Sequence, residues 1–428
     1  MLRFAAKRAG DQSLLDQGAC LVVHRQQIRR GVNVFKWLRR NQQANQLLAV
    51  RPLLDGVAVA LLEQLPNQQC VVRWTEYLSL SESGEPEPRA APAGADSAPA
   101  KDGEEQRASR DRRGGDRRSG DRRSGDRGGD RHSGDRRSGA RRAGETGASS
   151  GSEAAAGHDF ERLAPLLQRL VRQRDLRQVP CTGVLGSGDY SLILVDAPDV
   201  PPSEIRAAMR WQVKELIDFH IDDAVIDVFD VPERDGRSGR RLYAVAARRG
   251  KVVQLIDFLT AAGLNLNTID IPELAMRNLA ARLPEDIGGV ALIAFERDHG
   301  LMTVTRQGAL YFSRRVDCGS ERLAAALAEG GGSSALESLL DGLTIEIQRS
   351  LDFYERHFSQ PSIAGIVLAP VAGGGDEVCR YLSAQLGVPT RWLDLHADGA
   401  LAPELPALPA QTCVVAMGAA MRRDSVAL

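Results

Sequence analysis

The chain has 428 residues, 43% of them apolar, which predicts two or three compact units with sizeable buried cores. Its 55 Lys and Arg residues almost balance its 56 Asp and Glu residues, which excludes the strongly basic charge of a typical nucleic-acid-binding protein. The six cysteines form no CxxC pair and the seven histidines no HExxH motif, so a disulfide framework and a zinc site are both disfavoured.

Two kinds of membrane signal are missing from the sequence. No apolar run approaches the length of a membrane span, and the N-terminus lacks the apolar region of a signal peptide. We therefore expect a cytoplasmic protein that reaches a membrane only through a partner.

The first residues lead from a basic extension into a β-meander. Residues 1–45 are polar and basic and are expected to form a flexible N-terminal extension. Apolar runs at 47–54 and 57–62 flank Asp55-Gly56, a pair typical of a tight hairpin turn, and a third strand is expected at 70–77.

Residues 82–157 have a different composition. A five-residue unit recurs as GDRRS or GDRHS, and residues 110–142 hold 13 Arg and 6 Asp. This segment has almost nothing to bury, so we expect a disordered insertion. Arg-rich tracts can also bind RNA or anionic lipid through phosphate contacts, but aromatic residues are absent here and Asp neutralises about half of the charge. A solvated linker is the interpretation that we favour.

Residues 158–287 return to a globular pattern in which helices and strands alternate. The sequence predicts a helix at 160–176, an apolar strand at 191–195 buried on both faces, a helix from an N-cap at Ser203 to about 219, strands at 224–231 and 241–247, a helix at 251–261 ended by Gly263, a strand at 267–271 and a helix over 274–283.

A second unit begins at Gly288-Gly289. The sequence predicts a meander with strands at 290–295, 301–306 and 309–316, an Ala/Gly/Ser-rich stretch, a long helix over 343–358, a strand at 365–369, an AGGG loop at 372–375, a helix over 378–386, a strand at 390–395 and a helix at 416–423. Each half thus begins with a meander and continues in alternating strands and helices, which indicates an α/β protein of two related domains.

Several segments resemble one family. The run GDYSLILVDAPDVPPSEIRAAMRWQVKELIDFHIDDAVIDVFDVP at 188–232 is similar to the MshI family of the mannose-sensitive haemagglutinin (MSHA) type IV pilus, whose members are relatives of PilM. The resemblance continues through RLYAVAARRGKVVQLIDFLTAAGLNLNTIDIPELAMRNLAARLP at 241–284, ALYFSRRVDCG at 309–319, LTIEIQRSLDFYERHF at 343–358 and VVAMGAAMRR at 414–423.

The resemblance implies the actin-like ATPase (ribonuclease H-like) fold, shared with the cell-division protein FtsA. The first domain would then comprise 46–81 and 158–287, with an inserted subdomain at about 201–264, and the second would comprise 288–424. The Arg-rich insertion at 82–157 departs from the family pattern.

The resemblance also implies a role. PilM-like proteins are cytoplasmic scaffolds, peripheral at the inner membrane, that bind the N-terminal peptide of PilN, a bitopic membrane protein, and couple a pilus motor ATPase to it. A PilN-like partner is therefore expected, with no role for nucleic acid. The secretion homologue GspL continues into a membrane span that this sequence does not show, which favours pilus assembly. The alternatives are an active actin-like ATPase of pilus assembly or type II secretion, and an RNA- or lipid-binding protein acting through the Arg-rich tract.

An ATP site in this fold needs glycine-containing hairpins for the phosphates and carboxylates for Mg²⁺. Active members carry an Asp-Ile-Gly element in the first strand of each half. Here the first strand brings in Arg51 and Pro52 instead, and in the second half Asp298 and Gly300 come several residues late. We therefore expect no catalytic residue, no metal site and no bound cofactor, with ATP and Mg²⁺ as the alternative.

Three candidate site features remain. Gly373, Gly374 and Gly375 fall where an adenosine-contacting loop would lie, although an ordinary strand-to-helix turn also favours glycine. Trp211 falls off the apolar stripe of its helix, and Asp218 belongs to an acidic patch that follows this helix. Both residues are candidates for partner binding. The alternative for Trp211 is packing on a neighbouring strand, and the alternative for Asp218 is a solvated run of charges.

Overall fold

The computed structural model describes residues 45–65, 70–81, 158–201, 203–232, 240–330, 332–397 and 412–422. Two predicted segments lie outside these residues: the insertion at 82–157, and the N-terminal extension at 1–45 apart from its last residue. Within the described ranges, no helix combines the length and the apolar character that crossing a bilayer requires.

The first half is built on a five-stranded mixed sheet with the order β3-β2-β1-β4-β8. Its strands are β1 (Gln46–Leu53), β2 (Gly56–Gln64), β3 (Cys70–Ser79), β4 (Pro180–Val184) and β8 (Asn265–Asp270). The predicted hairpin is confirmed, but its turn is Leu54-Asp55, because Gly56 already pairs with Leu53. The first three strands are antiparallel neighbours, whereas β4 and β8 run parallel to β1.

The second half repeats this sheet with the order β11-β10-β9-β12-β13. Its strands are β9 (Val290–Phe295), β10 (Gly300–Arg306), β11 (Ala309–Val316), β12 (Gly365–Leu368) and β13 (Thr390–Trp392). The pattern of antiparallel and parallel pairs is the same as in the first half. At the β10–β11 turn both Gln307 and Gly308 have positive φ, at 53° and 76°, as a two-residue hairpin requires. The two predicted related domains are thus confirmed as one topology used twice.

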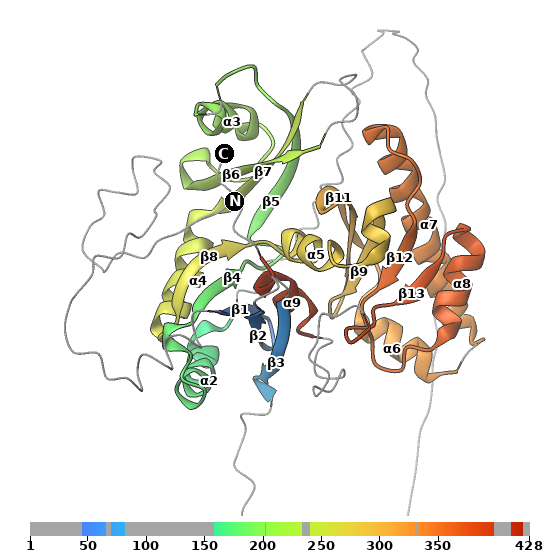
Figure 1. Ribbon diagram of the computed structural model, residues 1–428, viewed down its shortest axis with the longest axis horizontal. Coiled ribbons are helices and arrows are strands. Elements are labelled where there is room, and N and C mark those ends of the chain that lie inside the picture. Colours follow the sequence, from blue (N-terminus) through green and yellow to red (C-terminus); the bar gives the residue numbers. More distant parts are fainter. Residues whose placement is uncertain are drawn as a thin grey trace, which may run out of the picture. The chain divides into compact units, whose positions relative to one another are not determined.

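Helices flank both sheets (Figure 1). The first half carries α2 (Phe160–Gln173) and α4 (Arg249–Ala261), and the second carries α6 (Ser320–Ala328), α7 (Ser334–Phe358) and α8 (Asp376–Leu386). Short 3-10 turns lie at Leu176–Gln178, Ile221–Asp223 and Pro284–Gly288. The helix α2 has a large amphipathic stripe, with Leu163, Leu167 and Leu170 buried as the spacing predicts.

Two helices join the halves. Helices α5 (Pro272–Ala280) and α9 (Val414–Ala420) pack on each other, and α9 also covers β1, β2 and β4 while α5 covers β9, β10 and β11. Their crossing is close because Gly418 has no Cβ: one added there would collide with the carbonyl of Ala275. The apolar cluster around these helices contains residues of both sheets, so the halves share one continuous core.

A separate three-stranded antiparallel sheet, with the order β5-β7-β6, is inserted into the first half between β4 and α4. It contains β5 (Tyr190–Asp196), β6 (Ala224–Val231) and β7 (Arg241–Arg248), and α3 (Ile205–Lys214) packs on β6 and β7. The insertion therefore spans 190–248, whereas 201–264 was expected. Its predicted strand at 191–195 is only half-buried, because it is an edge strand rather than one covered on both faces. The N-cap of α3 is Glu204, not Ser203.

Candidate functional site

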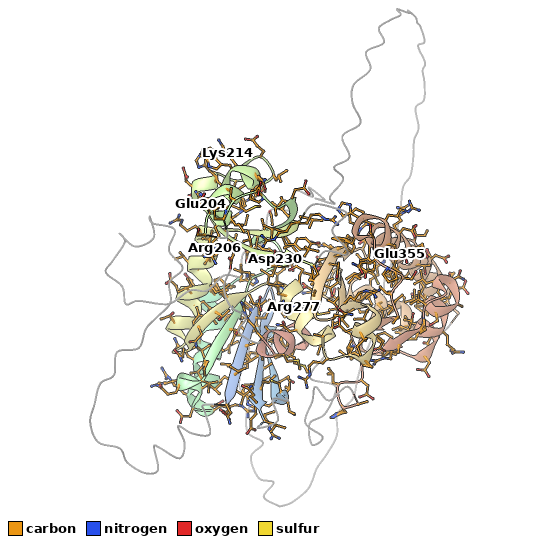
Figure 2. The ribbon with its side chains drawn as sticks, turned by 45° about the horizontal axis from the view of Figure 1, so that its top comes forward. Glu204, Arg206, Lys214, Asp230, Arg277 and Glu355 are labelled. Carbon is orange, nitrogen blue, oxygen red and sulfur yellow. The ribbon has the colours of Figure 1, made fainter. Side chains whose placement is uncertain are left out.

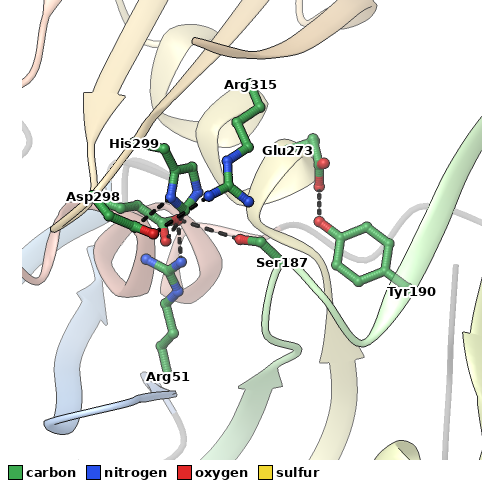
Figure 3. A network of polar contacts seen from close by, with 8 residues as sticks. Arg51, Ser187, Tyr190, Glu273, Asp298, His299 and Arg315 are labelled. Atoms are coloured by element: carbon green, nitrogen blue, oxygen red, sulfur yellow. Dashed lines mark hydrogen bonds and ion pairs between the residues drawn. The ribbon is translucent and has the colours of Figure 1, made fainter. Parts of the chain in front are cut away.

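The ends of the two hairpins that open the halves are joined by a buried ion pair. Arg51 lies in β1 with 4% of its surface exposed, and its guanidinium donates to the carboxylate of Glu296, which follows β9 (Figure 3). The side chain of Glu296 is 14% exposed. The pair therefore links the halves at a distance of 245 residues along the chain.

Glu296 is the centre of a wider polar network. Ser187, in the loop between β4 and β5, donates to its Oε1 at 3.5 Å, and His299 Nε2 lies 3.5 Å from its Oε2. His299 Nδ1 is 2.6 Å from Asp298, which also pairs with Arg315 at 3.4 Å. Burial raises the pKa of Glu296, but Arg51 and His299 outweigh it and leave the pKa below its usual value. Glu296 is thus held as a carboxylate.

The second hairpin is also fixed from the side of α6. The backbone N–H groups of Ser320 and Glu321 donate to the carbonyls of Glu296 and Arg297, at 2.6 and 3.2 Å. A Cβ at Gly319 would collide with the backbone of Arg297, which explains glycine at this N-cap. Since these first-turn N–H groups bind the hairpin, they are not free for an anion.

A second buried contact ties the inserted sheet to α5. Tyr190, at the start of β5, donates its hydroxyl to Glu273, which is 8% exposed (Figure 3). Burial raises the pKa of Glu273 to about 7, although the hydrogen bond from Tyr190 favours the carboxylate. Glu273 therefore changes charge near neutral pH, in contrast to Glu296.

These residues do not fit a nucleotide phosphate. A phosphate cradle needs free backbone N–H groups and a counter-charge. Here Pro52 has no N–H, and the guanidinium of Arg51 is already bound to Glu296 across the hairpins. At the hairpin tips Asp55 accepts from Tyr77 at 2.5 Å and lies 3.9 Å from Arg297, so its carboxylate is also engaged. The described residues contain no group of three or more His, Cys, Asp or Glu that could hold a metal ion.

The predicted glycine loop lies elsewhere, between β12 and α8. Gly373 has a φ of +74°, and a Cβ on Gly374 would come within 2.9 Å of the Trp392 ring. The carbonyl of Gly375 accepts from Trp392 Nε1 at 3.1 Å. The positive φ accounts for Gly373 and the packing of Trp392 for Gly374, whereas a Cβ on Gly375 would meet the side chain of Glu377. Among the described residues, no hydrogen bond or ion pair links this loop to Arg51 or Glu296.

The two residues predicted to bind a partner both lie on the inserted subdomain. Trp211 is 76% exposed on α3, and Leu216, just beyond the helix, is 56% exposed. Figure 2 shows Glu204 and Lys214 of the same region at the outer part of the subdomain. Asp218 pairs with Arg248 at 2.9 Å, and the Arg248 guanidinium lies 4.4 Å over the Phe219 ring. Trp211 and Leu216 are thus two exposed apolar side chains of the same subdomain, and we call these two residues the α3 surface.

Sequence reasoning noticed Arg51 only as a departure from an ATP-site pattern, and it missed Glu296, Tyr190 and Glu273. The one local signal was a charged residue inside an apolar strand, since a buried arginine requires a carboxylate or another acceptor. Nothing in the sequence around Arg51 says where that carboxylate lies.

Comparison with solved structures supplies the fold relationship. A PilM–PilN type IV pilus biogenesis complex contains a chain with 17% identity, covering 87% of this chain and 97% of that one, at a TM-score of 0.55. The cytoplasmic domain of EpsL, an inner-membrane component of the type II secretion system of Vibrio cholerae, has 10% identity, with 86% and 94% covered and a TM-score of 0.36. The ethanolamine utilization protein EutJ from Carboxydothermus hydrogenoformans has 8% identity, with 88% and 89% covered and a TM-score of 0.40. No family model matches the sequence.

The likeness to the PilM structure, together with the repeated sheet, establishes the fold. The chain has an actin-like ATPase fold of two related domains, each a mixed sheet flanked by helices, with a three-stranded subdomain inserted in the first.

Proposed function

We propose that this chain is a non-catalytic scaffold of type IV pilus assembly that binds a PilN-like inner-membrane protein. The observation that carries the proposal is the Arg51–Glu296 pair, which joins the two hairpins where an active relative would hold nucleotide phosphates. A side-chain link of this kind can hold the two halves together without a ligand. The PilM fold supports the pilus context.

The MshI family and the MSHA pilus are the finer assignment that we propose, on the resemblance of residues 188–284. In this proposal the protein is cytoplasmic and lies at the inner membrane through its partner, near a pilus motor ATPase. Neither ATP nor Mg²⁺ is required.

The partner would bind at the inserted subdomain, with the α3 surface as part of its contact. Trp211 and Leu216 are both exposed large apolar residues of this subdomain, and Trp is enriched among the residues that contribute most to the binding energy of interfaces. Asp218 would act at the rim, since its ion pair with Arg248 is exposed.

The test is binding of a fluorescent N-terminal peptide from the PilN-like protein of the same assembly system, followed by anisotropy. Trp211→Ala should weaken binding at least tenfold, because truncating an interface Trp commonly costs about 2 kcal/mol or more. Ile287→Ala is the matched control, since Ile287 is also 76% exposed but lies outside the subdomain. A peptide that binds neither variant nor wild type would reject this partner class, and equal weakening in both variants would reject the α3 surface.

A further inference from the structure

Strand β5 leaves one edge of the inserted sheet without a neighbouring strand. In the sheet order β5-β7-β6 it pairs with β7 alone (Figure 1). Just before β5 the carbonyl of Asp189 accepts from the Arg248 N–H at 3.1 Å, and just after it the Ala197 N–H donates to a carbonyl of the same neighbouring segment at 2.7 Å. Because the register between these bonds is continuous, the odd-numbered residues of β5 turn their backbone groups toward β7. The even-numbered residues point theirs outward: Tyr190, Leu192, Leu194 and Asp196.

The outward backbone groups of β5 are open in the part of the chain that the structure describes, where no residue hydrogen-bonds to them. The side chains beside them are apolar on both faces of the strand. Leu192 and Leu194 pack toward the main core, and Ile193 and Val195 pack toward the cluster beneath α3. All four are half-buried, and the run that they form contains no charged residue and no proline. Unpaired N–H and C=O groups next to apolar side chains form a template for another strand.

The other edge strands differ from β5. In β3, β8 and β11 an extra residue interrupts the register, and these residues are Arg73, Asn267 and Tyr311. Strand β13 has only three residues, and β6 packs against β11. Bulges, short strands and cover by other elements are the usual means by which proteins keep an edge from pairing. Strand β5, by contrast, keeps seven residues in one continuous register, so its edge is suited to strand addition.

The charges at one end of this edge limit what can bind there. Asp196 ends β5 and Asp199 follows it; both side chains are exposed, and neither has an ion pair with another described residue. Arg241, the neighbour of Asp196 on β7, donates instead to the carbonyl of His357 at 2.9 Å. A basic group of a partner would therefore meet two free carboxylates at this end of the strand.

We propose that the outer edge of β5 binds an extended apolar segment of a partner protein as a fourth strand of this sheet, with a Lys or Arg of that segment beside Asp196. The backbone of the segment would complete the ladder at Leu192 and Leu194, and its side chains would extend the apolar clusters on both faces. Because the sheet is antiparallel throughout, the segment would run antiparallel to β5, which places its basic residue at the N-terminal end. The contact goes beyond the proposed function, since it uses backbone groups rather than the α3 surface and requires no particular assembly system.

The test is fluorescence anisotropy of the full chain with a labelled designed peptide, an Arg followed by a run of Val and Thr residues. N-methylation of alternate residues leaves one edge of such a peptide free for hydrogen bonds, whereas N-methylation of every residue blocks both edges. We expect the first form to bind saturably and the second to bind at least about tenfold more weakly, because its backbone cannot donate to β5. On binding, hydrogen exchange followed by mass spectrometry should slow at 190–196 and stay unchanged at 224–231, in the strand at the opposite edge.

Charge reversal tests the same contact from the side of the protein. Asp196→Lys should weaken binding of the peptide by about threefold or more, a modest effect because the carboxylate is exposed. Asp257 is also exposed, on α4, so Asp257→Lys makes the same change of charge elsewhere and should leave the affinity unchanged. Equal affinity of the two methylated forms, unchanged exchange at 190–196, or no saturable binding by peptides with the Arg at either end would overturn the proposal. A chain that sediments as a dimer and already exchanges slowly at 190–196 would also overturn it, because a second copy would then fill the edge.

Discussion

The Arg51–Glu296 pair should contribute far more to stability than a surface ion pair does. In Glu296→Gln the Arg51 guanidinium, 4% exposed, loses its carboxylate and becomes a buried charge without a counter-ion. Breaking a buried pair in this way costs about 3–5 kcal/mol of the free energy of unfolding. Arg51→Met should cost a similar amount, since it leaves Glu296 with His299 and Ser187 alone.

A double-mutant cycle separates the pair from its surroundings. In the double variant Arg51→Met/Glu296→Gln both charges are gone, so the cost should be smaller than the sum of the single costs by at least about 1 kcal/mol. Urea unfolding at pH 7, followed by tryptophan fluorescence and by circular dichroism, would measure all four proteins.

The control is an exposed ion pair between the same hairpin and α6. Arg297 Nε lies 2.7 Å from Glu321, but the two side chains are 62% and 65% exposed. Arg297→Met should therefore change stability by no more than about 1 kcal/mol. If Glu296→Gln costs no more than Arg297→Met, the inference that a buried charge pair holds the halves together is refuted.

Three further results are expected. Glu273→Gln should remove a pH dependence of stability. Burial raises the pKa of Glu273 to about 7, so the stability of the wild type is fully present below about pH 4.5 and declines as pH rises to 7 and above. In urea unfolding the variant should therefore gain up to about 3 kcal/mol over wild type by pH 8, and a constant difference from pH 5 to 8 would contradict this. Gly418→Ala should lower the free energy of unfolding by about 1–3 kcal/mol, because the added Cβ meets the carbonyl of Ala275. Gly342→Ala, on α7 with open space around it, is the control and should be neutral or stabilising by up to about 1 kcal/mol. Equal shifts of the thermal midpoint in the two variants would contradict the close helix crossing. Trp211→Ala should change the free energy of unfolding by no more than about 0.5 kcal/mol, and a larger loss would mean that the Trp211 side chain packs on the protein.

Much of the fold could be predicted from local patterns. Strands β6, β9 and β11 have the predicted bounds, and the repeated meander identified two related halves. Strand β4 was missed because its sequence, PCTGV, has no apolar run; it is a strand through pairing with β1 and β8. Helix α6 was missed because its Ala-rich sequence, SERLAAALA, lies among Gly and Ser residues that suggested a loop.

The site could be predicted less well, since it depends on tertiary contacts. The partner of Arg51 is 245 residues away, and local periodicity carries no information about such a pair. For Trp211 the sequence left exposure and packing equally open, and only the folded subdomain decides between them. The glycine loop shows the reverse problem: Gly373–Gly375 have a motif-like composition, but turn geometry explains Gly373 and the packing of Trp392 explains Gly374 without a ligand.

The most direct test of the proposed scaffold is a titration of the purified full chain with ATP and Mg²⁺, with phosphate release measured in parallel. We expect neither saturable ATP binding at the hairpins nor turnover, and unchanged affinity for the PilN-like peptide whether or not ATP is present. Saturable ATP binding with turnover that Arg51→Met alters would contradict the proposal, because the two hairpins would then hold phosphates in spite of the Arg51–Glu296 pair.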